Sequence, residues 1–204
     1  AQNLAMKVLG LTGSIAMGKT TAARMLRRLG VPVHDADAAV HRALGKGGAA
    51  VPEIARLWPD AVTDGAVDRA VLGARVFEDT QALDRLEAIM HPLARRSSEA
   101  FLARHRRLRT PLVVLDIPLL FETGSHARCD AVAVVSAPHW LQAQRVLARP
   151  GMTTERLAAI RARQMPDREK RRRAQYVVET GLGKRYTLMK LAEIVRDMTA
   201  KSEV

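Results

Sequence analysis

Short, continuous runs of apolar residues recur along the chain and alternate with longer amphipathic segments. Such runs, bounded by glycine, proline or a carboxylate, are typical of strands that are buried on both faces of a parallel sheet. Strands that alternate with helices predict an α/β protein whose parallel sheet is covered on both sides. The predicted strands are residues 6–12, 31–35, 111–116, 131–135 and 176–179.

The segments between these runs carry apolar residues every three or four positions, which predicts helices. The clearest is 19–29, where Ala22, Met25, Leu26 and Leu29 would share one face and Gly30 would end the helix. Further helices are predicted at residues 36–44, 139–149, 154–164 and 185–199.

Residues 49–107 differ from this alternation, because they are mostly helical in pattern and contain no parallel strand. Thr63–Asp64–Gly65 gives a hairpin-like turn signal within them. His91–Pro92 is predicted to separate two helical stretches. We interpret the region as a helical lobe inserted into a single α/β domain.

Length and composition fit one cytosolic domain. The chain has 204 residues, 48% of them hydrophobic, and a single cysteine, Cys129. One cysteine forms neither an internal disulfide nor a multi-cysteine metal site, which favours a reducing compartment. The sequence shows no signal peptide and no apolar run of about 18 residues, so we expect no membrane association.

The net charge of +12, from 33 basic and 21 acidic residues, has two interpretations. One is nucleic-acid binding. The other is a basic face for phosphorylated small molecules. The densest basic runs, 104–107 and 168–173, contain no interleaved aromatic residues of the base-stacking kind. We therefore do not expect nucleic acid to be the main ligand.

Residues 13–20 have the pattern Gly, four residues, Gly-Lys-Thr, which is the Walker A motif. Glycines allow a tight turn whose N–H groups face phosphate oxygens, and the helix that follows adds its positive dipole end. Lys19 is expected to reach the β- and γ-phosphates, and the Thr20 hydroxyl to ligate Mg²⁺. The predicted nucleotide contacts are Gly13, Ser14, Ile15, Ala16, Met17, Gly18, Lys19, Thr20 and Thr21.

Asp35 and Asp37 follow the second predicted strand, at the edge of the sheet where ligands bind in open parallel sheets. A carboxylate at this position can accept a proton from an acceptor hydroxyl or hold a water on Mg²⁺. The alternative is a helix cap, because Asp37 precedes Ala-Ala-Val-His. Spacing alone leaves both interpretations open.

Asp116 ends the apolar run 111–116 and is a candidate for a Walker-B-type carboxylate that acts on Mg²⁺ through its bound water, or for a strand-end cap. The segment 118–122, which includes Leu120, would lie at the mouth of the site. Arg145 and Arg149 are four residues apart on one predicted helix. They would serve either as a phosphate-clamping lid or as a solvated basic face.

These segments together resemble the dephospho-CoA kinase family. The resemblance is carried by LGLTGSIAMGKTTAARMLRRLGVPVHDADAAVHR at 9–42, HPLAR at 91–95, LDIPLLFE at 115–122, QRVLARPGMT at 144–153 and RARQMPDREKR at 161–171. It extends from residue 9 to about 183. The blocks DADAAVH and DIPLLFE distinguish this family from adenylate, shikimate and other small P-loop kinases.

The resemblance implies a three-layer α/β/α fold of the P-loop NTPase type, with a five-stranded parallel sheet. The core would comprise residues 6–35 and 111–183, a helical substrate lobe about 40–110, and a lid about 144–165. It also implies ATP and Mg²⁺ as cofactors, and phosphorylation of the ribose 3′-hydroxyl of dephospho-CoA. We expect a cytoplasmic enzyme, either a monomer or a small homo-oligomer.

The resemblance also implies roles for individual residues. Asp37, or otherwise Asp35, would orient or deprotonate the acceptor hydroxyl, and Arg145 and Arg149 match the basic positions of the lid. His91 matches the His-Pro position of the family. The predicted substrate contacts are His91, Asp116 and Leu120.

The chain departs from the family pattern at two places. Ser14 and Ala16 stand where glycine is common, and we expect small effects because neither side chain is needed to hold phosphate. Ala174–Gln175 and Thr180–Gly181 replace the usual Ala-Asp and Asn-Gly, so the resemblance does not determine whether residues near 179–183 contact the adenine.

Three other functions remain open from the sequence. Another P-loop kinase of small molecules or nucleotides would share the loop. A nucleotide switch is disfavoured because no Asn/Thr-Lys-x-Asp guanine signature is present. A nucleic-acid-binding module is the third.

Overall fold

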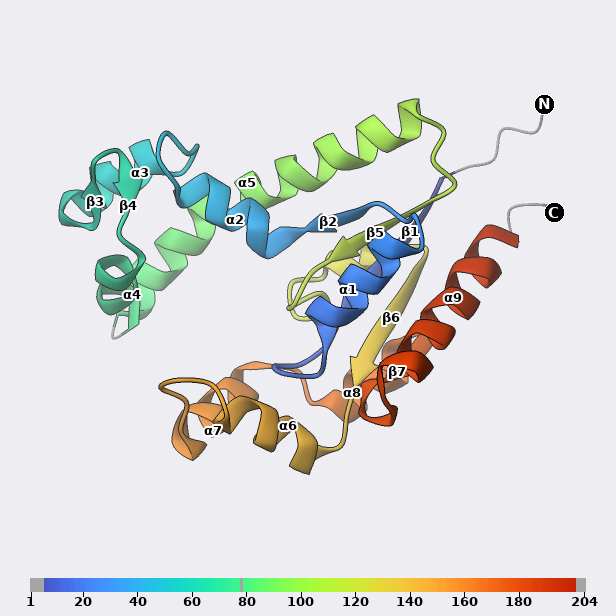
Figure 1. Cartoon of the computed structure of the whole chain (residues 1–204). Helices are drawn as coiled ribbons and strands as arrows, with labels where there is room; N and C mark the ends of the chain where they lie inside the picture. Colours follow the sequence, from blue (N-terminus) through green and yellow to red (C-terminus); the bar gives the residue numbers. More distant parts are fainter. Residues whose placement is uncertain (1–5, 78, 201–204) are drawn as a thin grey trace. The chain divides into compact units, whose positions relative to one another are not determined.

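The computed structural model describes residues 6–77 and 79–200. Its central feature is a parallel sheet of five strands in the order β2-β5-β1-β6-β7 (Figure 1). β1 pairs in parallel with both β5 and β6, and β6 pairs in parallel with β7. The strands are β1 (Lys7–Thr12), β2 (Val33–Asp35), β5 (Leu112–Asp116), β6 (Ala131–Ser136) and β7 (Tyr176–Glu179).

Alternate residues of β6 enter two different hydrophobic clusters, as the two-residue period of a strand requires. Ala133 and Val135 pack into a cluster with residues of α1 (Lys19–Arg28) and α9 (Lys184–Ala200). Val132 and Val134 pack on the opposite face with Leu120 and Phe121. Both faces of the sheet are therefore buried, which explains why its strands lack polar alternation.

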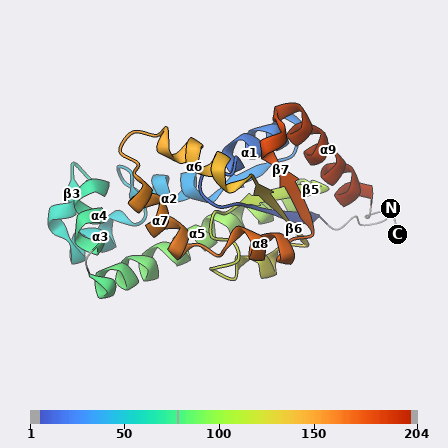
Figure 2. The same ribbon diagram turned by 90° about the horizontal axis from the view of Figure 1, so that it is seen from below.

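Helices cover both sides of the sheet and complete the predicted three-layer α/β/α fold (Figure 2). α1 and α9 lie on one face, while α8 (Asp167–Arg173) lies on the other, next to β6. α6 (His139–Leu147) and α7 (Thr154–Arg163) follow β6 in the chain. Two short 3₁₀ segments, Ser125–Arg128 and Thr180–Leu182, complete this part.

The chain divides into two compact units, and the second is Asp35–Arg104. Its small core contains Ile54, Ala61 and Leu72, against which Trp58 packs. Its elements are α2 (Ala36–Leu44), α3 (Val51–Leu57), a 3₁₀ turn at Pro59–Ala61, β3 (Val62–Thr63), β4 (Ala66–Val67), α4 (Arg69–Phe77) and the N-terminal part of α5 (Thr80–Arg107).

The hairpin predicted at Thr63–Asp64–Gly65 is confirmed, since β3 and β4 pair antiparallel across it. Asp64 and Gly65 have φ values of 51° and 75°, the left-handed conformation that a two-residue hairpin loop demands. The predicted helix break at His91–Pro92 is wrong, because α5 continues through Pro92.

α8 was not predicted, although its neighbours were. Its sequence, DREKRRR, has no apolar period that could indicate a buried face. Within residues 6–77 and 79–200, no helix combines the length and the apolar character that crossing a membrane requires.

Candidate nucleotide and phosphoryl-transfer site

The phosphate loop occupies the turn between β1 and α1 and is shaped by two glycines. A Cβ atom on Gly13 would lie 2.4 Å from Val135 Cγ2 and 2.8 Å from its carbonyl oxygen, so only glycine fits there. Gly18 has a φ of 93°, and a Cβ atom there would lie 3.1 Å from Thr180 Oγ1. Ala16 adopts the same left-handed region, at φ 59°, without being glycine.

The loop is tied to several later elements of the same unit. Arg145 Nη1 lies 3.3 Å from the Ala16 carbonyl oxygen, and Thr180 Oγ1 donates to the Met17 carbonyl at 2.6 Å. Ile15 contacts two glutamine side chains, Gln142 and Gln164. The α6 and α7 segments therefore hold the loop from outside, and the helix that follows the loop leaves its first N–H groups available for an anion.

Lys19 and Asp116 meet directly. Lys19 Nζ lies 2.6 Å from Asp116 Oδ1, and the two side chains are 16% and 4% exposed. Asp116 ends β5, whose neighbour β1 leads into the loop, so the parallel register brings the two groups together. The buried carboxylate of Asp116 and the hydroxyl of the exposed Thr20, the residue after Lys19, are oxygen donors of the kind that could hold a magnesium ion.

Asp35 and Asp37 belong to the second unit and differ in their local contacts. Asp35 Oδ1 accepts the Ala38 N–H at 2.9 Å and is the N-cap of α2. Asp37 lies in the first turn of that helix and is exposed. The interpretation of Asp37 as the helix cap is therefore wrong, since Asp35 has that role.

The two predicted lid arginines do not share a helix. α6 ends at Leu147, so Arg149 lies beyond it, and its side chain is exposed. Arg145 is partly buried, and besides Ala16 it contacts the Oγ1 and carbonyl oxygen of Thr180 at 3.4 and 3.3 Å. The prediction of one helical face for both residues is wrong, because α6 is shorter than its sequence pattern suggested.

Leu120 and His91, two of the predicted substrate contacts, differ in how far they are buried. Leu120 is fully buried in the cluster with Phe121 and Val132, so packing accounts for it. His91 is exposed on α5, in the second unit.

Glu122, at the end of the same DIPLLFE block, accepts the Met165 N–H at 2.8 Å and lies 3.0 Å from Nζ of the fully buried Lys170. Its partial burial alone would raise its pKa. Hydrogen bonds from the backbone N–H groups of Glu122 and Met165, together with the Lys170 ammonium, hold the pKa of Glu122 below its usual value.

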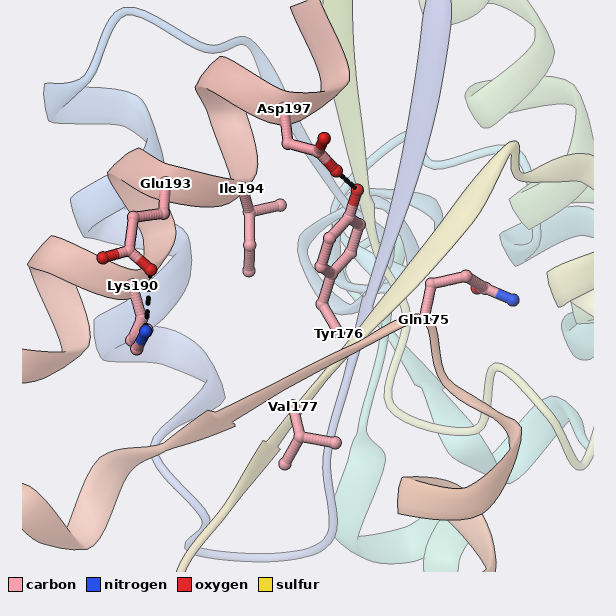
Figure 3. A pocket seen from close by; sticks show the side chains of 7 residues that line it. All are labelled: Gln175, Tyr176, Val177, Lys190, Glu193, Ile194 and Asp197. Carbon is pink, nitrogen blue, oxygen red and sulfur yellow. Dashed lines mark hydrogen bonds and ion pairs between the residues drawn. The ribbon is translucent and has the colours of Figure 1, made fainter. Parts of the chain in front are cut away.

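A separate groove of about 300 Å³ lies between β7 and α9 (Figure 3). Tyr176 on β7 donates a hydrogen bond to Asp197 on α9, and Lys190 pairs with Glu193 along α9. Its lining consists of Gln175, Tyr176, Val177, Lys190, Glu193, Ile194 and Asp197, none of which is a predicted site residue.

Sequence reasoning missed the residues that support the loop. Gln142, Gln164 and Thr180 lie 127, 149 and 163 residues from their respective loop partners in the sequence. A single polar residue on a helix or at a strand end carries no local signal of such a contact. Gln164 does lie in the block 161–171 that carries the family resemblance, but the block's sequence gives no sign of its contact with the loop.

A parallel sheet with a Walker A loop between its central strand and the next helix defines a P-loop nucleotide-binding protein, and Lys19 and Asp116 meet beside that loop. The dephospho-CoA kinase family model matches residues 7–183. The chain belongs to the dephospho-CoA kinase family.

Individual relatives agree with this assignment. A dephospho-CoA kinase of Paramagnetospirillum magneticum is 68% identical over 166 residues, 81% of this chain and 78% of the relative. One from Novosphingobium aromaticivorans is 54% identical over 195 residues, 96% of each chain. The crystal structure of TT1252 from Thermus thermophilus is similar with a TM-score of 0.82 and 40% identity, over 94% of this chain and 97% of that one.

Proposed function

We propose that this protein transfers the γ-phosphate of ATP to the ribose 3′-hydroxyl of dephospho-CoA and so forms coenzyme A. The observation that carries the proposal is the built phosphate loop, with Lys19 held against Asp116, in a chain that the family model matches from residue 7 to 183. Relatives named dephospho-CoA kinase cover nearly the whole chain, which supports the acceptor.

The loop residues would bind the triphosphate. Lys19 would leave Asp116 for the β- and γ-phosphates, where its charge offsets the negative charge that develops as the bond loosens. Thr20 and Asp116 are the residues that would hold Mg²⁺. That ion, when bound, supplies Lewis-acid neutralisation of the phosphate oxygens. The N–H groups at the start of α1 bind phosphate through their unpaired donors and the helix dipole.

Asp37 is our candidate for the group that orients or deprotonates the acceptor hydroxyl. Asp37 is exposed, and the cap of α2 is Asp35, so the Asp37 carboxylate is free of that structural task. We also propose that His91 contacts dephospho-CoA and that Arg149 closes over the phosphates as part of the lid. A cytoplasmic location and a monomer or small homo-oligomer complete the proposal.

The test is a coupled assay of ADP release with dephospho-CoA compared against a panel of other hydroxyl acceptors. Dephospho-CoA should be preferred by orders of magnitude, and phosphorylated product should match ADP released.

Lys19→Ala should reduce turnover by at least about 1000-fold, as expected for loss of a transition-state charge contact. Lys184→Ala, an exposed lysine at the start of α9, is the control and should retain activity. Equal rates with another acceptor would overturn the assignment.

A further inference from the structure

Both backbone polar groups of Ile15, inside the phosphate loop, are held by glutamine side chains. Gln164 Oε1 accepts the Ile15 N–H at 3.1 Å, and Gln142 Nε2 donates to the Ile15 carbonyl at 2.9 Å. An N–H group only donates and a carbonyl only accepts, so these contacts fix which end of each amide faces the loop. Gln164 therefore turns its amide oxygen toward the loop, and Gln142 turns its amide nitrogen toward it.

Gln142 is itself braced. Its side chain is almost completely buried, and its Oε1 accepts from Arg161 Nε at 3.0 Å and Nη2 at 2.6 Å. Arg161 lies on α7 and Gln142 on α6, while Gln164 is the C-cap residue of α7. The two helices are therefore joined to each other and to the loop through one connected set of hydrogen bonds.

The geometry of the peptide unit gives these contacts a consequence. In a trans peptide the carbonyl of one residue and the N–H of the next point in opposite directions. A carbonyl of Ile15 held outward by Gln142 therefore directs the Ala16 N–H to the other side of the loop. Thr180, which holds the Met17 carbonyl, acts in the same way on the Gly18 N–H.

The two halves of the loop differ in how they are supported. The N–H groups of Lys19 and Thr20 lie in the first turn of α1, which orients them without outside help. Ala16 is outside the helix and in a left-handed conformation that alanine disfavours. Its N–H direction therefore depends on the contacts that hold Ile15.

We propose that Gln142 and Gln164 are positioning residues for phosphoryl transfer, because they hold both backbone groups of Ile15 and so aim the Ala16 N–H at the terminal phosphate of ATP. This rests on the proposed function only in so far as ATP binds at the loop. The helix donors suffice for a diphosphate, whereas the added phosphate of ATP also needs the donor that the glutamines orient.

The test measures nucleotide affinity by calorimetry without any acceptor, using ADP and a non-hydrolysable ATP analogue. Gln164→Met and Gln142→Met keep the side-chain length and remove the hydrogen bonds. Each should weaken binding of the ATP analogue at least about 5-fold while ADP affinity changes less than about 2-fold. With ATP and dephospho-CoA, kcat should fall about 10-fold, with a smaller change in the KM for dephospho-CoA.

Gln142→Glu separates the two contacts of that residue. It retains an oxygen acceptor for Arg161 but no longer has the Nε2 donor to Ile15. It should show the same loss of preference for the ATP analogue as Gln142→Met. Its melting temperature should be higher than that of Gln142→Met, because the contact with Arg161 is kept. A recovered preference would assign the effect to the Arg161 brace and overturn the proposal.

Thr187→Val is the matched control, since it removes another side-chain hydrogen bond, from buried Thr187 in α9 to the carbonyl of Gly183, the residue before that helix. It should lower the melting temperature without changing the ratio of the two affinities. The proposal is overturned when Gln164→Met and Gln142→Met keep the parent's ratio, or when Thr187→Val changes it equally. Gln164 is only half-buried, so Gln164→Met decides the question alone if Gln142→Met fails to fold. A protein that binds ATP but ignores dephospho-CoA would contradict the proposed acceptor and leave this test valid.

Discussion

Two carboxylates that are two residues apart have different local functions in α2. Asp35 accepts the Ala38 N–H and satisfies one of the donors that a helix leaves unpaired at its start. Asp37 is two residues further along the chain, within the first turn of α2, where its negative charge is favourable to the helix dipole but its side chain stays exposed. The structure thus separates the capping role from the role proposed in catalysis.

Asp37→Asn is expected to lower turnover by about 100-fold or more, because it removes a carboxylate that takes or orients the hydroxyl proton. ATP affinity should stay within a few-fold, because the loop and Thr20 are unchanged. The measurements are steady-state kinetics and a thermal melt, in which Asp37→Asn should match the parent.

The contrasting variant is Asp35→Ala. It should lose about 1 kcal/mol of stability through the lost cap. Unchanged turnover in Asp37→Asn would remove Asp37 from the catalytic residues and leave Asp35 as the candidate. Asp35→Asn keeps the cap, so any loss of turnover in it that raised Mg²⁺ relieves would indicate a role toward the metal.

The residues around the loop show what the sequence alone could and could not predict. The Walker A pattern predicts roles for Lys19 and Thr20 because its spacing is local in the sequence. Gln142, Gln164 and Thr180 act on the loop across distances of 127 to 163 residues in sequence, and nothing in their neighbourhoods indicates it. Contacts of this kind are set by the fold and become visible only when the fold is known.

At the scale of elements, β1, β5, β6 and β7 were predicted from their apolar runs. The short strand β2, Val-His-Asp, has no such run, and it was predicted from Val31–Pro32–Val33 after Gly30. α8 escaped prediction because a helix of charged residues has no apolar period, although Lys170 within it is buried. α5 continues through Pro92, where proline propensity predicted a break. Local propensity failed where long-range packing or an ion pair determines the structure.

Arg145 and Arg149 lie on different elements and should respond differently to mutation. Arg145→Ala removes contacts to the Ala16 and Thr180 carbonyls and should weaken ATP binding and lower turnover together. Arg149→Ala should lower turnover more than nucleotide or dephospho-CoA binding, as expected for a group that acts on charge in the transition state. Wild-type behaviour of Arg149→Ala at saturating substrates would leave Arg149 as a solvated basic residue.

The pair Glu122–Lys170 joins the segment after β5 to α8 and should contribute strongly to stability. Glu122→Gln keeps an acceptor for the Met165 N–H but leaves the fully buried Lys170 ammonium without its carboxylate. We expect a loss of about 3 kcal/mol in the free energy of unfolding, measured by denaturant titration. Glu99→Gln, which breaks the exposed pair with Arg95, should cost less than about 1 kcal/mol.

The direction of the pH dependence follows from the lowered pKa of Glu122. A carboxyl whose folded pKa is depressed contributes stability above its unfolded pKa and loses it as the pH falls through the folded value. The parent should therefore lose this contribution below about pH 4.5, while Glu122→Gln should not. Parallel acid titrations of the two proteins would contradict the assignment.

At the scale of the whole molecule, the net charge of +12 suits ligands that carry phosphates. A basic protein concentrates such ligands near its surface, and the attraction weakens as salt screens it. The same excess of positive charge increases self-repulsion in the folded chain. Stability at either extreme of pH is then sensitive to the few groups whose pKa values are shifted by folding.

Tyr176 is such a group, and it joins the last strand of the sheet to the last helix. Its hydroxyl donates to Asp197, and burial, followed by this hydrogen bond and the negative charge of Asp197, raises the pKa of Tyr176 to about 12 (Figure 3). The neutral phenol is thus favoured by the fold. A group with a raised folded pKa contributes stability below its unfolded pKa, near 10, and loses it as the pH rises through the folded value.

We therefore expect the free energy of unfolding of the parent to fall between about pH 10 and pH 12 by more than that of Tyr176→Phe. The measurement is the difference in unfolding free energy between the two proteins at a series of pH values, which cancels the titration of groups that they share. Lys190, whose pKa is also raised by Glu193 on the same helix, is the main shared group nearby. The difference should be constant below pH 9 and decline above pH 10. A difference that is independent of pH throughout would show that the Tyr176 hydroxyl does not titrate in the way its burial and its bond to Asp197 require.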